Sequence, residues 1–268
     1  MRLPMPAVRH ALRDYAPAAA LLLALLVVWE AAVRVLDVAP YLVPAPSRIA
    51  RAFMEVRGTL PDHLRTTAAE AALGLAFSAA LGAGCAALLA WTTPLRRAVY
   101  PLLVISQNVP LVVIAPLLVV WFGFGMLPKV LVVTLMGFFP IVVATTDGLL
   151  RADGDLVELA RSYGASRWQV LREVLIPSAV PAFFAGLQIS AAYAVLGAVI
   201  AEWVGASSGL GLFITRSQTA FRVDRVFVAV AVIAALSIAS FAAVHLAARL
   251  AMPWQHVAHG GAQEEVRG

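Results

Sequence analysis

The sequence predicts an all-α membrane protein with six transmembrane helices. Of its 268 residues, 62% are hydrophobic and only 13% are charged, which leaves too little polar surface for a soluble globular protein of this length. Long apolar runs recur along the chain, each close to the roughly 20 residues that a helix needs to cross a bilayer. The formal net charge is +5. Its basic residues are spread over the termini and loops, which favours contact with lipid head groups over nucleic-acid binding.

The expected spans cover residues 17–35, 66–91, 99–121, 127–147, 181–203 and 226–250. The Pro- and Arg-rich segment 39–65 is expected to lie in the interface, with a short amphipathic helix that begins at Pro46 or Ser47. We expect a single transmembrane domain over residues 16–250, with cytoplasmic tails at 1–15 and 251–268. The basic residues are divided so evenly between the two sides that the positive-inside rule supports this orientation only weakly.

Proline and glycine interrupt several spans. The prolines are Pro101, Pro110 and Pro116 in the third span and Pro140 in the fourth. Each removes an amide donor, and inside a bilayer the freed carbonyl must find a partner in the protein or in a water-lined cavity. A bundle that lines a pathway predicts this pattern, although a packed bundle without a pathway predicts part of it. In the second span, small residues predict helix packing at Gly74, Gly82 and Gly84.

A polar segment, residues 148–177, separates the fourth and fifth spans and contains the signals of two short helices. Asp155 is expected to cap the first helix, with Glu158 three residues later, and Ser166 is expected to cap the second, with Gln169 three residues later. Gly164 lies between them, where a positive φ would end the first helix and turn the chain. We refer to residues 148–177 as the coupling segment.

The coupling segment resembles the cytoplasmic EAA loop of permease subunits of bacterial ATP-binding-cassette (ABC) importers. The matching residues are Glu158-Leu159-Ala160, Gly164 and Val174-Leu175-Ile176-Pro177, with both spacings intact. Leu159, Val174 and Ile176 depart from the motif, each by one apolar residue for another. Further motifs are similar to the nitrate, sulfonate and taurine importer family, including Pro44-Ala45-Pro46-Ser47, Trp121-Phe122-Gly123-Phe124-Gly125 and Ser208-Gly209-Leu210-Gly211. The run from Ala115 to Leu118 and the segment from Lys129 to Gly148 look most like permeases for thiamine-precursor pyrimidines or riboflavin.

This resemblance implies the type I importer permease fold and a non-enzymatic transport subunit without a cofactor. The implied partners are a second copy of the permease, a pair of cytoplasmic ATP-binding subunits and an extracytoplasmic substrate-binding protein. The chain itself has no Gly-rich phosphate loop followed by Lys and Ser or Thr. The residues implied to couple the permease to the ATPase are Glu158, Leu159, Ala160, Tyr163, Gly164, Ala165, Ser166 and Pro177.

Individual roles within the coupling segment remain open at the sequence level. The apolar face of the first helix is expected to consist of Leu156, Leu159, Ala160 and Tyr163. The tip at 164–166 should insert deepest into the ATPase. Glu158 would either meet an Arg across the interface or serve only as a capping residue. Pro177 would pass motion into the fifth span.

Polar residues near the spans are candidates for the pathway. Glu202 would line an outer gate or receive substrate, or else form a salt bridge to Arg216 or Arg222. Gln107 and Asn108 are pathway candidates, with a polar contact between helices as the alternative. Glu30 and Glu70, near span ends, are expected to pair or to extend toward the interface.

Two other functional classes compete with an importer permease. An ion-coupled secondary carrier or channel would need its own internal coupling site, but the charges lie mainly at span ends and no inverted repeat is visible. An intramembrane enzyme is less consistent with the sequence, which contains no HExxH motif. Capture of a cytoplasmic ATPase would separate the importer from both.

Overall fold

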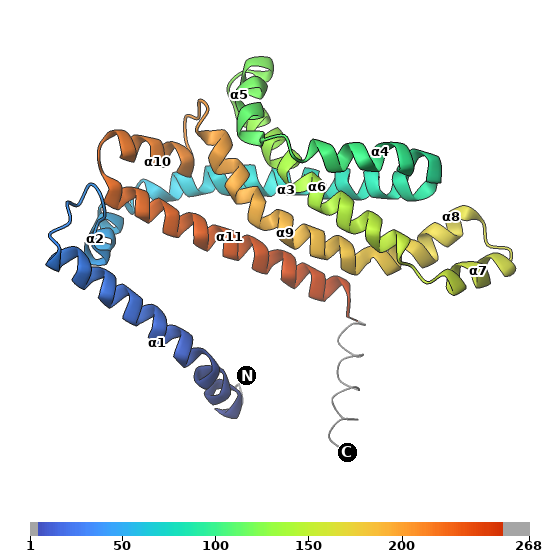
Figure 1. Ribbon diagram of the computed structural model, residues 1–268, viewed down its shortest axis with the longest axis horizontal. Coiled ribbons are helices and arrows are strands. Elements are labelled where there is room, and N and C mark those ends of the chain that lie inside the picture. The colour runs from blue at the N-terminus through green and yellow to red at the C-terminus, as the bar shows by residue number, and fades with distance from the viewer. Residues whose placement is uncertain (1–4, 254–268) are drawn as a thin grey trace. The chain divides into compact units, whose positions relative to one another are not determined.

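The computed structural model describes the backbone of residues 5–253 and the side chains of residues 16–253, and all regular secondary structure in this part of the chain is helical (Figure 1). The remainder of the predicted C-terminal tail, residues 254–268, lies outside the described residues. The helices are α1 (Met5–Val35), α2 (Pro46–Val56), α3 (Leu60–Trp91), α4 (Thr93–Ser106), α5 (Leu111–Phe122), α6 (Met126–Leu150), α7 (Gly154–Ser162), α8 (Arg167–Val170), a π-helical segment (Leu171–Leu175), α9 (Ile176–Glu202), α10 (Leu210–Thr219) and α11 (Val223–Ala251).

Five helical segments of the described chain are long and apolar enough to cross a bilayer, and α4 with α5 forms a sixth candidate as a bent pair. The all-α membrane fold is therefore confirmed. The amphipathic helix expected from Pro46 or Ser47 is also present, because α2 begins at Pro46 with Ala45 as its N-cap residue. The helix α10 was not predicted, since its segment follows a Gly- and Ser-rich stretch.

The third predicted span is not one continuous helix. The axes of α4 and α5 are bent by 97° at a short break, which agrees with the interruption expected from the prolines of this span, although the size of the bend was not predicted. Pro110 is the physical reason, because it has no amide hydrogen and disfavours helical φ/ψ at the residue before it. The side-chain amide of Asn108 donates to the carbonyl oxygens of Val104 and Ile105, both at 3.2 Å, and satisfies the exposed end of α4.

The chain divides into two compact units. Unit 1 comprises residues 1–61 and 213–231, and unit 2 comprises residues 62–212 and 232–268. In unit 1, the Glu30 carboxylate accepts hydrogen bonds from the Ser47 amide at 2.9 Å and the Ser47 hydroxyl at 2.7 Å. It also pairs with Arg34, which confirms the expected pairing of Glu30. Trp29 packs against Phe227 with ring centroids 5.5 Å apart.

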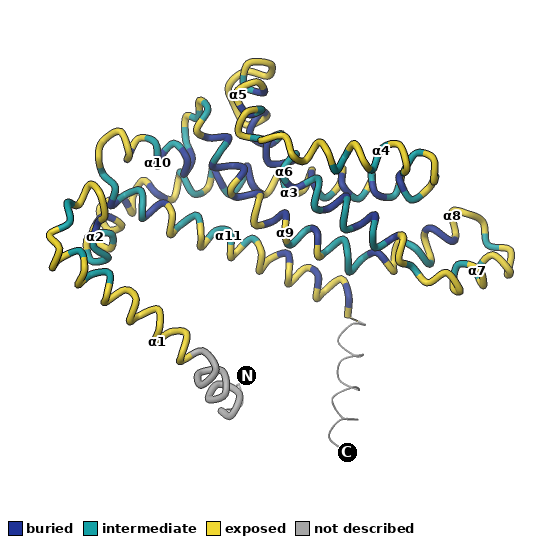
Figure 2. The backbone as a smooth tube through the Cα atoms, viewed as in Figure 1, coloured by how far each residue is buried: buried dark blue, intermediate teal, exposed yellow. Residues whose placement is uncertain are grey.

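The core of unit 2 is formed by α6 and α9, whose buried residues are shown in Figure 2. Small residues allow close packing there: the Ser190 hydroxyl donates to the Gly137 carbonyl oxygen at 2.7 Å. In α3, added side chains at Gly74 and Gly82 would overlap Val133 and Ile141 of α6, so both positions are packing glycines as predicted. Gly84 differs, because no described atom lies within 4 Å of a Cβ placed there.

Candidate functional site

The first helix of the coupling segment, α7, is capped by Asp153 rather than by Asp155. The Asp153 carboxylate accepts a hydrogen bond from the Asp155 amide at 2.9 Å, and α7 begins at Gly154. The expected pairing of Asp155 with Glu158 was therefore wrong, because a capping box that starts at Asp153 would require its acidic partner at Leu156. The alternative that Glu158 serves only as a capping residue of α7 therefore does not hold.

The turn between α7 and α8 has the predicted form. Gly164 has a φ of +82°, a conformation that favours glycine. The Ala165 amide donates to the Ala160 carbonyl oxygen at 3.1 Å, and the Gly164 amide donates to that of Arg161 at 2.9 Å. This pair of bonds is a Schellman motif, which fixes the direction of the chain after α7.

The second helix of the coupling segment starts at the predicted capping box. The Ser166 hydroxyl accepts from the Gln169 amide at 3.3 Å, while the Gln169 side chain accepts from the Ser166 amide at 2.8 Å. No break follows at Pro177, where the boundary with the fifth span was expected. Instead, α8 runs through the π-helical segment into α9, giving one helix of 36 residues from Arg167 to Glu202. The π-helical turn immediately precedes Pro177, which cannot donate an amide hydrogen bond.

The residues expected to contact a partner are mostly exposed. On α7, Leu159 is 53% exposed and Tyr163 is 85% exposed. Glu158, Gly164 and Ser166 are exposed as well. Ala160, Ala165 and Pro177 complete the predicted set, the first two being half-buried and Pro177 exposed. Large apolar side chains exposed on a helix of low overall hydrophobicity indicate a surface for protein contact.

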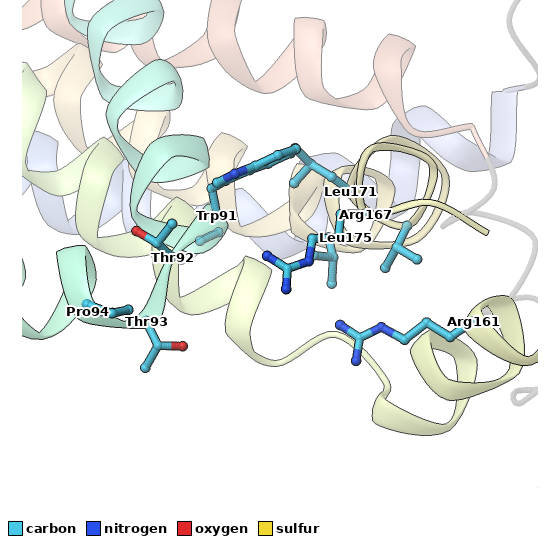
Figure 3. Close-up of a pocket in the computed structure, with 10 residues that line it drawn as sticks. Trp91, Thr92, Thr93, Pro94, Arg161, Arg167, Leu171 and Leu175 are labelled. Atoms are coloured by element: carbon cyan, nitrogen blue, oxygen red, sulfur yellow. The ribbon is translucent and has the colours of Figure 1, made fainter. Parts of the chain in front are cut away.

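A cavity of about 430 Å³ lies beside the coupling segment, between the junction of α3 and α4 and the helices α7 and α8 (Figure 3). Arg161 and Arg167 line it together with Thr92 and Thr93. Trp91 packs against Trp168 at the same place, with ring centroids 6.4 Å apart. Among the side chains that the structure describes, neither arginine forms an ion pair. The cavity was not predicted, because it depends on contact between segments far apart in the sequence.

At the opposite end of α9, Glu202 is buried. Thr67 donates to its Oε1 at 2.6 Å, and the Gly211 amide donates to its Oε2 at 2.5 Å. Both carboxylate oxygens thus have donors from the same unit. Arg222, one of the salt-bridge partners that the sequence left open, uses its guanidinium on Glu55 and Asp224 in unit 1. A role for Glu202 at an outer gate remains a prediction.

Two further charged residues lie near Glu202. The Lys129 ammonium is 2.6 Å from the Glu70 carboxylate, and both side chains are buried. Pairing of Glu70 was expected, but Lys129 was not singled out. The available signal was that Lys129 is the only lysine of the sequence and stands at the start of an apolar run.

The two uncharged pathway candidates lie at the break between α4 and α5. Gln107 and Asn108 are both exposed, and the Asn108 amide is used locally on the end of α4. Gln107 and Asn108 thus lie between α4 and α5 and are exposed, whereas Glu202 lies at the end of α9 and is buried. Their role in a pathway remains a prediction.

Comparisons with known proteins agree with this architecture. Residues 73–252 match the family described as binding-protein-dependent transport system inner membrane component. The formylaminopyrimidine transport permease protein ThiX of Halalkalibacterium halodurans is 39% identical, covering 87% of this chain and 93% of the relative. The riboflavin transport system permease protein RibX of Chloroflexus aurantiacus is 34% identical, covering 93% of this chain and 95% of the relative.

A solved structure shows the same fold at lower sequence similarity. It is an inward-facing conformation of the MetNI methionine ABC transporter, with a TM-score of 0.59 and 21% identity over 72% of this chain and 97% of that chain. The family match decides between the transport hypotheses, because a secondary carrier or channel would not share this family. The chain belongs to the binding-protein-dependent inner membrane components and is a permease subunit of an ABC importer.

Proposed function

We propose that the coupling segment docks on a cytoplasmic ATP-binding subunit and transmits its movement directly into the membrane. The observation that carries this proposal is the continuous helix from Arg167 to Glu202. A force applied at α8 reaches the far end of α9 without crossing a flexible loop. The Schellman turn at Gly164 fixes the direction in which the chain leaves α7, and only Ala165 and Ser166 separate this turn from α8, so α7 and α8 would move as one body.

The contact surface is composed of apolar side chains on α7 and charges beside it. Leu159 and Tyr163 would enter a groove of the ATPase, with Glu158 meeting an arginine of that partner. The cavity beside Arg161 and Arg167 would accept an acidic side chain of the same partner, because it presents two guanidinium groups to one space.

The complete importer would contain two permease chains, a pair of ATP-binding subunits and an extracytoplasmic binding protein. ATP hydrolysis would take place on the partner, in agreement with the absence of a phosphate-binding loop motif from this sequence. Both termini and the coupling segment would be cytoplasmic. Two differently tagged copies of the permease should therefore co-purify with the ATPase.

The proposed substrate is a small nitrogen heterocycle delivered by the binding protein. The support comes from ThiX and RibX, whose names state formylaminopyrimidine and riboflavin transport. Permeases named for aliphatic sulfonates and taurine are less similar, at 29% and 27% identity. Uptake of labelled formylaminopyrimidine, riboflavin and taurine by proteoliposomes that contain the complete importer would distinguish these substrates.

Two substitutions test the docking role. Gly164→Pro cannot adopt the observed φ of +82°, and Glu158→Lys reverses an exposed charge. We expect each variant to insert into the membrane normally but to lose uptake and to retain little ATPase after purification. Glu158→Gln is the matched control for side-chain length. Normal uptake by both variants, measured with labelled substrate, would contradict the docking role.

A further inference from the structure

Unit 2 buries three ionisable side chains together within the spanning helices. Glu70 of α3 and Glu202 of α9 are each 1% exposed, and Lys129 of α6 is 6% exposed. If both glutamates were ionised, the three groups would carry one negative charge in excess. An uncompensated charge that is buried so completely in the protein is strongly disfavoured, because it is removed from water.

The donors around the two carboxyl groups leave one oxygen unsatisfied. Glu202 accepts from Thr67 and from the Gly211 amide, and Glu70 Oε1 accepts from Lys129. Among the residues that the structure describes, none donates to Glu70 Oε2, although this oxygen is buried. A buried acceptor without a donor requires an explanation.

The neighbouring carboxyl group is that of Glu202, because Thr67, which donates to Glu202 Oε1 at 2.6 Å, lies one turn before Glu70 on α3. Two ionised carboxylates have no hydrogen to share, since both are acceptors only. The other titratable group near the turn is His63, whose Nδ1 accepts from the Gly209 amide at 3.1 Å. It faces the turn beside the carboxyl pair and does not supply the missing donor.

We propose that Glu70 and Glu202 bind one proton between them. The proton forms an O–H bond on one carboxyl group and a hydrogen bond to the other, which supplies the missing donor. It also makes the group of Glu70, Glu202 and Lys129 electrically neutral. A monovalent metal ion would bring the same charge but needs several free oxygen ligands, whereas three of the four carboxyl oxygens here already face a protein donor.

The proton site joins four parts of the structure. Glu70 belongs to α3, Lys129 to α6 and Glu202 to α9, while Gly211 lies at the start of α10. The Leu210 amide also donates to Thr67 at 2.9 Å. Loss of the proton would set two ionised carboxylates against each other and weaken the closure of the α9–α10 turn on α3. The contacts that close the α9–α10 turn on α3 are therefore stable only while the carboxyl pair holds its proton.

Infrared spectroscopy of the permease, purified with its ATPase and reconstituted in lipid vesicles, tests this proposal. A protonated carboxylic acid has a carbonyl stretching band that an ionised carboxylate lacks. Wild-type protein labelled with ¹³C-glutamate should show this band shifted by the isotope at neutral pH. No variant is needed for this measurement, and absence of the shifted band would overturn the proposal.

Variants then assign the band to the pair. We expect Glu70→Gln and Glu202→Gln each to abolish it, because the remaining carboxylate pairs with Lys129 and no longer needs a proton. The double variant Glu70→Gln with Lys129→Gln should restore it, since Glu202 then faces no cation and is held as a neutral acid. Glu55→Gln, which changes an exposed glutamate of α2, is the control and should leave the band intact.

Each remaining outcome counts against the shared proton. A band that survives in either single variant would place the proton elsewhere. Failure of the double variant to restore the band would show that Lys129 does not set the protonation of Glu202. A change in the wild-type carboxylate bands on addition of Na⁺ would identify a metal ion in place of the proton. These measurements do not depend on docking of the coupling segment or on the transported substrate.

Discussion

Gly209 permits the turn between α9 and α10 to close on Glu202. Its φ is +125°, and a Cβ at this position would overlap the Glu202 carboxyl group. We expect Gly209→Ala to lower the free energy of unfolding by about 1–3 kcal/mol from backbone strain alone, with a further loss from displacement of Glu202. The change can be measured as the loss of folded protein on heating in detergent.

Gly84→Ala is the matched control for this substitution. Gly84 lies in α3 with open space around its Cα, and alanine is favoured over glycine in a helix by about 1 kcal/mol. We therefore expect unchanged or slightly higher stability there. Equal stability of the two variants would show that Gly209 is not constrained by Glu202.

Glu55 gives unit 1 a pH-dependent contact. The hydrogen bond from Arg222, followed by that from Arg225, lowers the pKa of Glu55 from its ordinary value of 4.5. A lowered pKa in the folded state stabilises the protein above the unfolded pKa, and this stabilisation is lost as the pH falls through the folded value. We expect Glu55→Gln to be less heat-stable than the wild type at about pH 7, with the difference vanishing once the pH has fallen below the lowered pKa of Glu55.

A control for the pH effect is available at another exposed pair. Asp62→Asn removes the partner of Arg65, an exposed pair at 3.9 Å, for which a negligible contribution is expected. Thermal unfolding of wild type and both variants across the same pH range provides the comparison. A constant difference between wild type and Glu55→Gln at all pH values would exclude the ion pair as its cause.

At the level of residues, local signals were predictable and distant pairings were not. The capping box of Ser166 and Gln169 depends on residues three apart, so the sequence contains all of it. Asp153 and Asp155 both fit an N-cap, and only the start of α7 distinguishes them. Glu70 and Lys129 are separated by 59 residues, and their contact depends on the packing of α3 against α6, which hydropathy does not specify.

At the level of elements, hydropathy located the spans but did not show where a helix bends and where it continues. Residues 99–121 are apolar almost throughout, and the pattern is equally satisfied by one helix or by two helices that meet at 97°. Pro110 marked the break, but prolines also occur inside intact helices here, as Pro116 does in α5 and Pro140 in α6. The unbroken passage from α8 to α9 was missed for the converse reason, because Pro177 suggested a boundary.

The continuity of α8 and α9 gives a prediction about stiffness. Arg172 and Glu173 are exposed residues of the π-helical segment. Replacing both by glycine should loosen the helix, because each glycine costs about 1 kcal/mol relative to alanine. We expect this variant to retain ATP hydrolysis by the assembled importer while substrate uptake falls severalfold.

The double alanine variant of Arg172 and Glu173 is the matched control, since it removes the same side chains but preserves the helix. Uptake and ATP hydrolysis should be measured on the same proteoliposomes. If the alanine variant loses as much uptake as the glycine variant, then the side chains matter and the stiffness of the helix does not.

At the scale of the whole molecule, the two ends of α9 should face opposite sides of the membrane. Ser166 precedes the 36-residue helix that ends at Glu202, and Ser207 lies beyond that end. Both residues belong to unit 2 and are exposed. The sequence contains one cysteine, Cys85, so a Cys85→Ala background permits single reporters. A membrane-impermeant maleimide applied to intact spheroplasts should label Ser207→Cys at once and Ser166→Cys only after permeabilisation. Labelling of Ser166→Cys from outside would place the coupling segment away from any cytoplasmic ATPase and would contradict the proposed coupling.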